Sequence, residues 1–366
     1  MQLVNGTSMK AEYTLGLDPE GRERVIVVIK GTFAIPWDGS QPSLAGEQVP
    51  LVMADEFTGE PGKSATKYES EFAPYKPRCD VLLNGSAYAP HGTRVTRVDV
   101  ALRVATMAKS LSVHGQRVWQ EAITIGPSEP EPFTRMPISY DGAFGGVDVA
   151  VHDPSQVRAF MKNPVGVGYY PLTSGADLVG RPLPTTSTIG DPVSSASGDY
   201  PPMSFGAIGR QFESRVPLAG TYDQRWLDNT FPFLPSDFNP LYYQSAPPDQ
   251  QIAYPVGGER VELFNLTPQG YTQFPLPRIE MPVEFTDVRG TRTDCQAVLD
   301  TILIEPDLAR FMLIWRTSLP LRRNLLELRQ AVVGRMSPGY YYARSVGKKY
   351  FKSIQTFVLA RRGEVE

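Results

Sequence analysis

The residues of this chain that could carry chemistry are concentrated in one aromatic stretch, residues 220–251. Three of its aspartates, Asp223, Asp228 and Asp237, lie among Trp, Tyr and Phe side chains. Glycoside hydrolysis needs two carboxyl groups about 5–10 Å apart, so this stretch permits the hypothesis of a carbohydrate-active hydrolase. The same aspartates can instead fix turns by accepting hydrogen bonds from nearby backbone groups, and turn preferences favour that interpretation.

Other candidates for catalysis or metal binding are weak. The three histidines, His91, His114 and His152, have no metal-binding neighbour at short spacing, and no nucleophile motif is present. We expect His114 to be a structural histidine at the end of a strand. Carboxylates recur at Asp55, Glu56, Glu60, Glu69 and Glu71, but their spacing matches no known metal-binding loop, so a solvated surface is expected. We therefore assign no catalytic residue, no cofactor and no metal.

Residues 220–251 should form a long irregular loop. Proline recurs through the stretch and removes backbone donors, which disfavours both helices and ladders of strands. One or two helical turns remain possible, for example at 223–228. Long loops without regular structure are uncommon in compact domains and tend to be functional.

The rest of the chain predicts a mainly β protein, an antiparallel sandwich or open barrel with long irregular loops and a few short helices. Val25–Ile35 reads as a central strand, with Lys30 on its solvent side or ion-paired. Residues 98–104 and 111–113 alternate apolar and polar side chains and predict a hairpin. A second hairpin should join 296–304 to 310–316 across Glu305-Pro-Asp307. A short helix is expected at 153–161.

One amphipathic helix is expected near the C-terminus. Leu321, Leu325, Leu328 and Val332 recur at helical spacing, Ser318 and Pro320 suit its start, and Gly334 suits its end. Arg322, Arg323 and Arg329 lie off the apolar face. From Glu305 onward there are twelve Lys and Arg against five Asp and Glu, so a basic surface that steers an acidic partner is one interpretation. The other is a solvated face.

The chain resembles a bacterial family of unknown function that is encoded in type VI secretion clusters beside VgrG spike and PAAR tip proteins. The resemblance rests first on GTYDQRW (220–226), FPFLPSDFNP (231–240) and APPDQQ (246–251). It extends over most of the chain, through the segments KGTF (30–33), EQVPLVMADEF (47–57), YKPRCDVLLNGSAYAP (75–90), MPISYDGAFGG (136–146), NPVGVGY (163–169) and GGERVELFNL (257–266), with a closing strand region near Asp300.

The resemblance implies an effector adaptor, or chaperone, that binds a toxin effector or its PAAR or VgrG carrier and promotes loading onto the spike. It implies no catalytic residues, so we expect a non-enzymatic protein. A structural component of the secreted particle is a further alternative. Trp, Tyr and Arg dominate binding hot spots, which gives the candidate partner-binding residues Tyr222, Arg225, Trp226, Phe231, Tyr242, Tyr243, Arg322, Arg323 and Arg329. The structural alternative is that Arg225 ties the loop to a strand, because a loop of this length needs anchors of its own.

Composition sets limits on these functions. The chain has 366 residues, 41% hydrophobic and 20% charged, with a net charge of −3, so nucleic-acid binding is not indicated. No apolar run approaches the length of a membrane span, and the N-terminus shows no secretory signal. We expect a cytoplasmic protein with two buried, reduced thiols, Cys79 and Cys295. Residues 1–366 are interpreted as a single large β-rich domain, with a possible division near 173–204.

Overall fold

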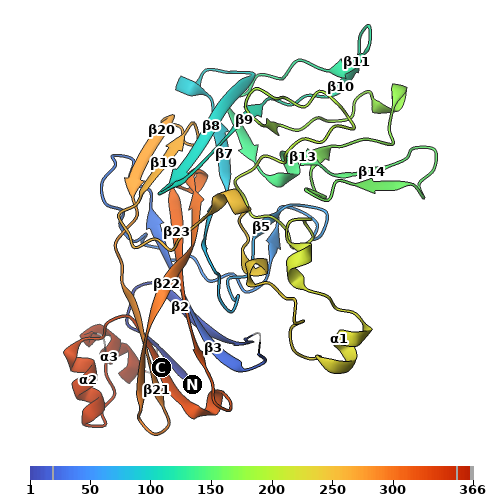
Figure 1. Cartoon of the computed structure of the whole chain (residues 1–366). Helices are drawn as coiled ribbons and strands as arrows, with labels where there is room; N and C mark the ends of the chain where they lie inside the picture. Colours follow the sequence, from blue (N-terminus) through green and yellow to red (C-terminus); the bar gives the residue numbers. More distant parts are fainter. Residues whose placement is uncertain (19, 352, 363–366) are drawn as a thin grey trace.

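A computed structural model describes residues 1–18, 20–351 and 353–362 (Figure 1). Strands account for 37% of the chain and helices for 14%, which confirms a mainly β fold. The largest sheet runs in the order β1 (Gln2–Asn5), β24 (Leu328–Val333), β21 (Met281–Asp287), β22 (Arg292–Glu305), β23 (Arg310–Pro320), β3 (Glu23–Ala34) and β2 (Lys10–Leu17). No helix of the described residues is long and apolar enough to cross a membrane.

This sheet curls into a nearly closed barrel. Its two outer strands, β1 and β2, lie close to each other, as two hydrogen bonds show. The Tyr13 hydroxyl of β2 donates to the Met1 carbonyl at 3.3 Å, and the Asn5 side chain of β1 donates to the Met9 carbonyl at 2.7 Å. Most pairings are antiparallel, but β1 runs parallel to β24. Closure of the barrel leaves few unpaired sheet edges.

Strand β3 is buried on both faces, as its apolar run predicts. Val25, Val27 and Ile29 face the main core, whereas Ile26 and Val28 belong to a second cluster. Phe33 of β3 stacks on Phe311 of β23 with ring centroids 5.3 Å apart, and Phe274 stacks on the other side of Phe311 at 4.9 Å. The main core therefore lies between the barrel wall and the second sheet.

The second sheet contains the predicted hairpin of residues 98–113. Its order is β17 (Thr186–Ser187), β9 (Met107–His114), β8 (Arg97–Val104), β19 (Arg260–Phe264) and β20 (Tyr271–Pro275). Alternate residues of β8 are buried, so its period-2 pattern reports a half-buried strand, as expected. The short pairs that surround both sheets are β4 (Glu56–Phe57) with β5 (Thr66–Tyr68), β7 (Gly85–Tyr88) with β12 (Arg135–Ile138), β10 (Trp119–Glu121) with β11 (Ile125–Pro127), β13 (Phe144–Gly145) with β16 (Val167–Gly168), and β14 (Val147–Val149) with β15 (Val157–Ala159).

Strand β22 changes pairing partners along its length, and buried polar side chains lie where the change occurs. Its first half pairs with β21, and its second half pairs in parallel with β6 (Cys79–Leu83), which also carries the two-residue β18 (Gln251–Ile252). The register against β23 shifts between Leu299 and Thr301. Asp300 therefore lies at a bulge, a feature that commonly re-aims a side chain.

Several local predictions are wrong. Residues 321–333 form a turn and β24 instead of a helix, and the helical segments near the C-terminus are α2 (Pro338–Ser345) and α3 (Ile354–Arg361). Residues 153–161 form a turn and β15. Cys79 is buried, but Cys295 is only half-buried, and both are free thiols. The single-domain assignment and the division near 173–204 stay predictions.

Candidate functional site

The predicted loop is irregular, as expected, and part of it projects from the molecule. We call residues 220–238 the arm; its helix α1 (Gln224–Asn229) stands away from the barrel in Figure 1. Phe233 touches the barrel at the turn between β2 and β3: a Cβ on Gly21, which has φ +77°, would lie 2.5 Å from the Phe233 ring. Gly21 thus serves both the turn and this close approach.

Two of the arm's aspartates, Asp223 and Asp237, accept backbone hydrogen bonds and so have the turn-fixing role predicted for them. Asp223 caps α1 by accepting from the Trp226 backbone N–H at 2.8 Å. Asp237 accepts from the Thr221 N–H at 3.0 Å and from its hydroxyl at 2.7 Å, and these bonds lower the pKa of Asp237. Asp228 accepts from the Gln224 amide at 2.8 Å.

The aromatic residues of the arm form a small cluster with one side open to solvent. The Trp226 ring lies 4.7 Å from Tyr222 and 5.6 Å from Phe231, and its Nε1 donates to the Phe233 carbonyl at 2.9 Å. Tyr222 is nevertheless 54% exposed, Leu227 50% and Phe231 61%. Trp226 therefore organises the arm from within, and its neighbours expose apolar surface to solvent.

Other candidate residues lie at the base of the arm or outside it. Tyr242 and Tyr243 are half-buried and pack against Phe238. Arg225 is exposed, and its guanidinium has no ion pair within the described residues, so the proposed tie to a strand is not found. Arg322 and Arg323 lie on the turn after β23, and Arg329 lies on β24. The helix predicted for these three arginines is wrong, but all of them are exposed.

Charged side chains are buried where the sequence predicts a solvated surface. Lys30 is 1% exposed and pairs with Glu71 at 2.7 Å, so its ion pairing is confirmed and its place on the solvent side is wrong. Glu69, also buried, accepts from both terminal nitrogens of Arg215, at 2.8 and 3.0 Å. Ion pairs of Glu69 and Glu71 thus hold residues 69–71 against Arg215 and strand β3.

A second group of buried charges surrounds the bulge of β22. Lys76 donates to Asp80 at 2.7 Å and to the Thr301 hydroxyl at 3.1 Å. Arg316 Nε lies 3.0 Å from Asp300 Oδ2. Burial nevertheless raises the pKa of Asp300, although Arg316 opposes this rise. Removing one partner of such a buried pair strongly lowers the stability of the fold, because the other charge is left unpaired.

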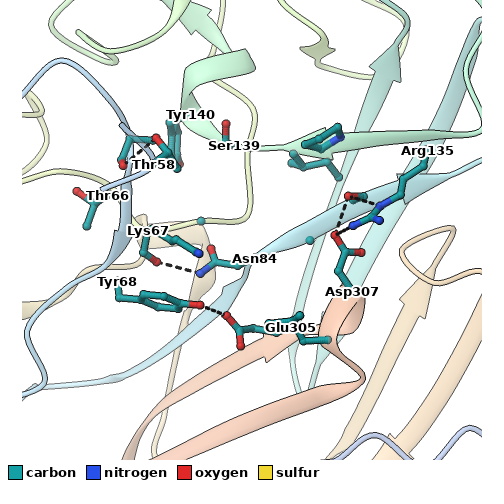
Figure 2. A pocket seen from close by; sticks show the side chains of 17 residues that line it. Thr58, Thr66, Lys67, Tyr68, Asn84, Arg135, Ser139, Tyr140, Glu305 and Asp307 are labelled. Atoms are coloured by element: carbon teal, nitrogen blue, oxygen red, sulfur yellow. Dashed lines mark hydrogen bonds and ion pairs between the residues drawn. The ribbon is translucent and has the colours of Figure 1, made fainter. Parts of the chain in front are cut away.

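A cleft of about 380 Å³, lined by both apolar and polar groups, opens near this junction (Figure 2). Its walls come from β5, β12, Asn84 between β6 and β7, and the turn that follows β22. Figure 2 shows Glu305 and Asp307 on the floor, Lys67 and Tyr68 on one wall, and Arg135 opposite. The volume falls within the range of small-ligand sites.

Both carboxylates of the cleft are already neutralised. Glu305 accepts from the Tyr68 hydroxyl and from Arg310 Nε at 2.7 Å. Asp307 accepts from Ser86 at 2.7 Å, Tyr88 at 2.8 Å and Arg135 at 2.5 Å. Burial, together with the bond to Asp307, raises the pKa of Tyr88 to about 12. The hydrogen-bonding capacity of both carboxylates is therefore largely used within the protein.

No sequence pattern predicts this cleft. Glu305-Pro-Asp307 predicts only a hairpin turn, and the remaining residues come from segments up to about 240 positions away. Lys67 is the one lining cation that has no ion pair in the part of the chain that the structure describes; its Nζ lies 5.2 Å from the Tyr68 ring centroid. Within the same residues, no group of three or more His, Cys, Asp or Glu is placed to hold a metal.

His114 is buried and structural, as expected, and its lowered pKa should make the stability of the protein depend on pH. Its Nε2 lies 2.9 Å from the Ser187 hydroxyl. Burial, aided by Arg117 and Arg97, lowers its pKa from 6.5 to about 4. The unfolded chain therefore binds a proton between these values that the folded chain does not, so stability should fall as the pH falls from about 6.5 towards 4.

Replacing His114 with glutamine should remove this dependence. We expect the loss of unfolding free energy between pH 7 and pH 5 to shrink by about 2 kcal/mol in the variant. Urea denaturation at both pH values measures the difference, and replacement of the exposed His91 with glutamine is the control. An equal pH dependence in wild type and His114→Gln would contradict the assignment.

Comparison with known proteins places the chain in a family. No curated protein and no solved structure matches it. One family model, described as an uncharacterized protein conserved in bacteria, matches residues 20–316. This range includes the arm, the cleft and the buried charges, and it spans well over half of the chain. The protein therefore belongs to the DUF2169 family of bacterial proteins.

Proposed function

We propose that this protein is a non-enzymatic effector adaptor of a type VI secretion system. It binds a toxin effector, or the PAAR or VgrG protein that carries the toxin, in the cytoplasm and promotes loading onto the spike. The partner class is drawn from the resemblance of residues 220–251 and the segments around them to such adaptors. The one structural observation that supports a binding role is the exposed apolar surface of the arm.

The arm has the composition of a binding hot spot. Tyr222, Leu227 and Phe231 are each at least half exposed, although burial of such side chains in an interface would be favourable by roughly 1–3 kcal/mol each. Exposed apolar groups gathered on one projecting segment commonly mark interaction sites. Trp226 holds these groups in a defined arrangement before binding, which lowers the ordering cost of association.

The polar flanks of the arm suit a partner that must later be released. Arg225 and Asp228 lie beside the apolar residues and are exposed. An interface with a small apolar centre and a charged rim gives moderate affinity, whereas obligate partners bury larger and more apolar surfaces. An adaptor needs moderate affinity because it transfers its cargo to the spike.

The test is a pull-down from the native cytoplasm with wild-type protein and two variants. Phe231→Ser should reduce recovery of a toxin, PAAR or VgrG chain by about tenfold or more, with an unchanged melting temperature because Phe231 is 61% exposed. Ile123→Ser is the matched control, since Ile123 is also an exposed apolar residue but lies between β10 and β11. Equal recovery with both variants would exclude the arm as the interface.

Two further measurements, secretion after firing and glycan turnover, separate the alternatives. A structural component of the particle would appear outside the cell after firing, whereas an adaptor stays behind. A carbohydrate-active hydrolase would turn over a glycan and lose that turnover in Asp223→Asn and Asp237→Asn. Both carboxylates already accept backbone hydrogen bonds, which argues for the adaptor.

A further inference from the structure

A second cavity lies between α2 and the hairpin of β21 and β22. It holds about 230 Å³ and is lined chiefly by Glu284, Arg292, Arg329, Tyr340, Tyr341 and Arg344. Figure 1 shows α2 beside β21 at the end of the barrel where the N-terminus lies. Three arginines from three elements therefore converge on one small space.

These arginines are poorly neutralised. Among the described residues, the Arg329 side chain has no ion pair. Arg344 donates only to neutral groups, the Tyr340 hydroxyl at 2.9 Å and the Gln330 amide oxygen. Arg292 reaches Glu284, at 3.5 Å. The lining thus contains three cations and one carboxylate, an imbalance that favours an anion in the cavity.

The surroundings extend this imbalance along the chain. From Leu328 to Gly363 the sequence contains eight Lys and Arg and no Asp or Glu, although the whole chain has a net charge of −3. Arg322 and Arg323 are exposed on the turn that precedes β24. A single small anion would use only the cavity, whereas an extended acidic chain would also use the surface beside it.

We propose that this cavity binds a carboxylate side chain of an acidic segment in a partner protein. Arginine presents a planar fork of donors that matches a carboxylate bidentately. No acceptor for the Arg329 guanidinium is found among the described residues. The Tyr340 and Tyr341 rings line the cavity beside Arg344 and Arg292, which lie over them at 5.6 and 5.9 Å. The site does not depend on the arm, so either can fail without the other.

The test measures the anisotropy of a fluorescein-labelled peptide of eight glutamates, with a peptide of eight glutamines as reference. At low salt, Arg329→Gln should weaken glutamate-peptide binding by about tenfold. Arg335→Gln is the matched control because Arg335 is exposed and pairs with Glu280, outside the cavity. It should change binding by less than about twofold. Glu284→Gln should strengthen binding, since it removes the opposing carboxylate.

Three results would overturn the proposal. Equal weakening by Arg329→Gln and Arg335→Gln would show a diffuse positive field. A small-anion site would be indicated if inorganic phosphate raised the melting temperature of the wild type but not of Arg329→Gln, while the glutamate peptide did not bind. Vesicles with anionic lipid that bind in an Arg329-dependent manner, again without peptide binding, would show a membrane surface. Melting temperatures of all variants confirm that each is folded.

Discussion

Replacing Asp80 with alanine should lower the free energy of unfolding by about 3–5 kcal/mol, because it leaves a buried ammonium group without its counter-ion. Asp80 is fully buried and accepts from Lys76 at 2.7 Å and from the Gln244 amide at 2.6 Å. It also accepts from the backbone N–H and the hydroxyl of Ser245, at 2.8 and 3.0 Å. The substitution removes all four bonds together.

Urea denaturation of Asp80→Ala measures this loss. The matched control is Glu60→Ala, which breaks the exposed pair between Glu60 and Lys63 and should cost no more than about 1 kcal/mol. Adding Lys76→Met to Asp80→Ala should restore part of the stability, since it removes the stranded charge. A loss below about 1 kcal/mol for Asp80→Ala would contradict the structural role given to this pair.

The sequence predicts the strands well where burial follows the local pattern. Residues 25–29 are apolar without interruption and form a strand covered on both faces, while residues 98–104 alternate and form a strand covered on one face. In both cases the environment of each side chain is set by its position on a pleated strand. No partner distant in the sequence needs to be known.

The C-terminal helix was misplaced because two kinds of structure share the same local signals. Leu321, Leu325 and Leu328 are spaced as on a helix, but Leu328–Val333 pairs with β1 and β21 instead. Gly334 has φ +74°, a conformation that ends a strand as readily as a helix. Pairing with two distant strands overrides the weak helical preference of this segment.

The buried charges and the cleft could not be predicted because their partners are far apart in sequence. The sequence places Lys30 on the solvent side of its strand, because it does not show that Glu71 lies 2.7 Å away in the fold. Asp80 meets Gln244 across 164 positions. The internal contacts of the arm, in contrast, follow from local sequence, since its aspartates and aromatic residues contact one another within one short stretch.

Replacing Arg215 with alanine should cost about 3–5 kcal/mol of unfolding free energy and loosen the base of the arm. The Arg215 side chain is 2% exposed and donates to Glu69, to the Ile208 carbonyl at 2.8 Å and to the Tyr242 carbonyl at 2.6 Å. It thus ties the chain just before the arm, at 215, to the chain just after it, at 242, through one guanidinium group.

The matched control shares the same carboxylate. Arg210 also pairs with Glu69, at 2.8 Å, but from the exposed side, so Arg210→Ala should cost no more than about 1 kcal/mol. Arg215→Lys should recover only part of the loss, because an ammonium group cannot serve Glu69 bidentately and two carbonyls together. Equal losses for Arg210→Ala and Arg215→Ala would contradict the assignment of Arg215 as the anchor.

Hydrogen exchange then separates global from local effects. If Arg215 anchors the arm, amides of residues 216–243 should exchange faster in Arg215→Ala, beyond what the lower global stability produces in β3 and β23. Partner binding should weaken in the same variant although Tyr222, Leu227 and Phe231 are unchanged, because a loosened arm must be ordered on binding. A partner that binds Arg215→Ala as tightly as wild type would show that the arm recognises it without this anchor.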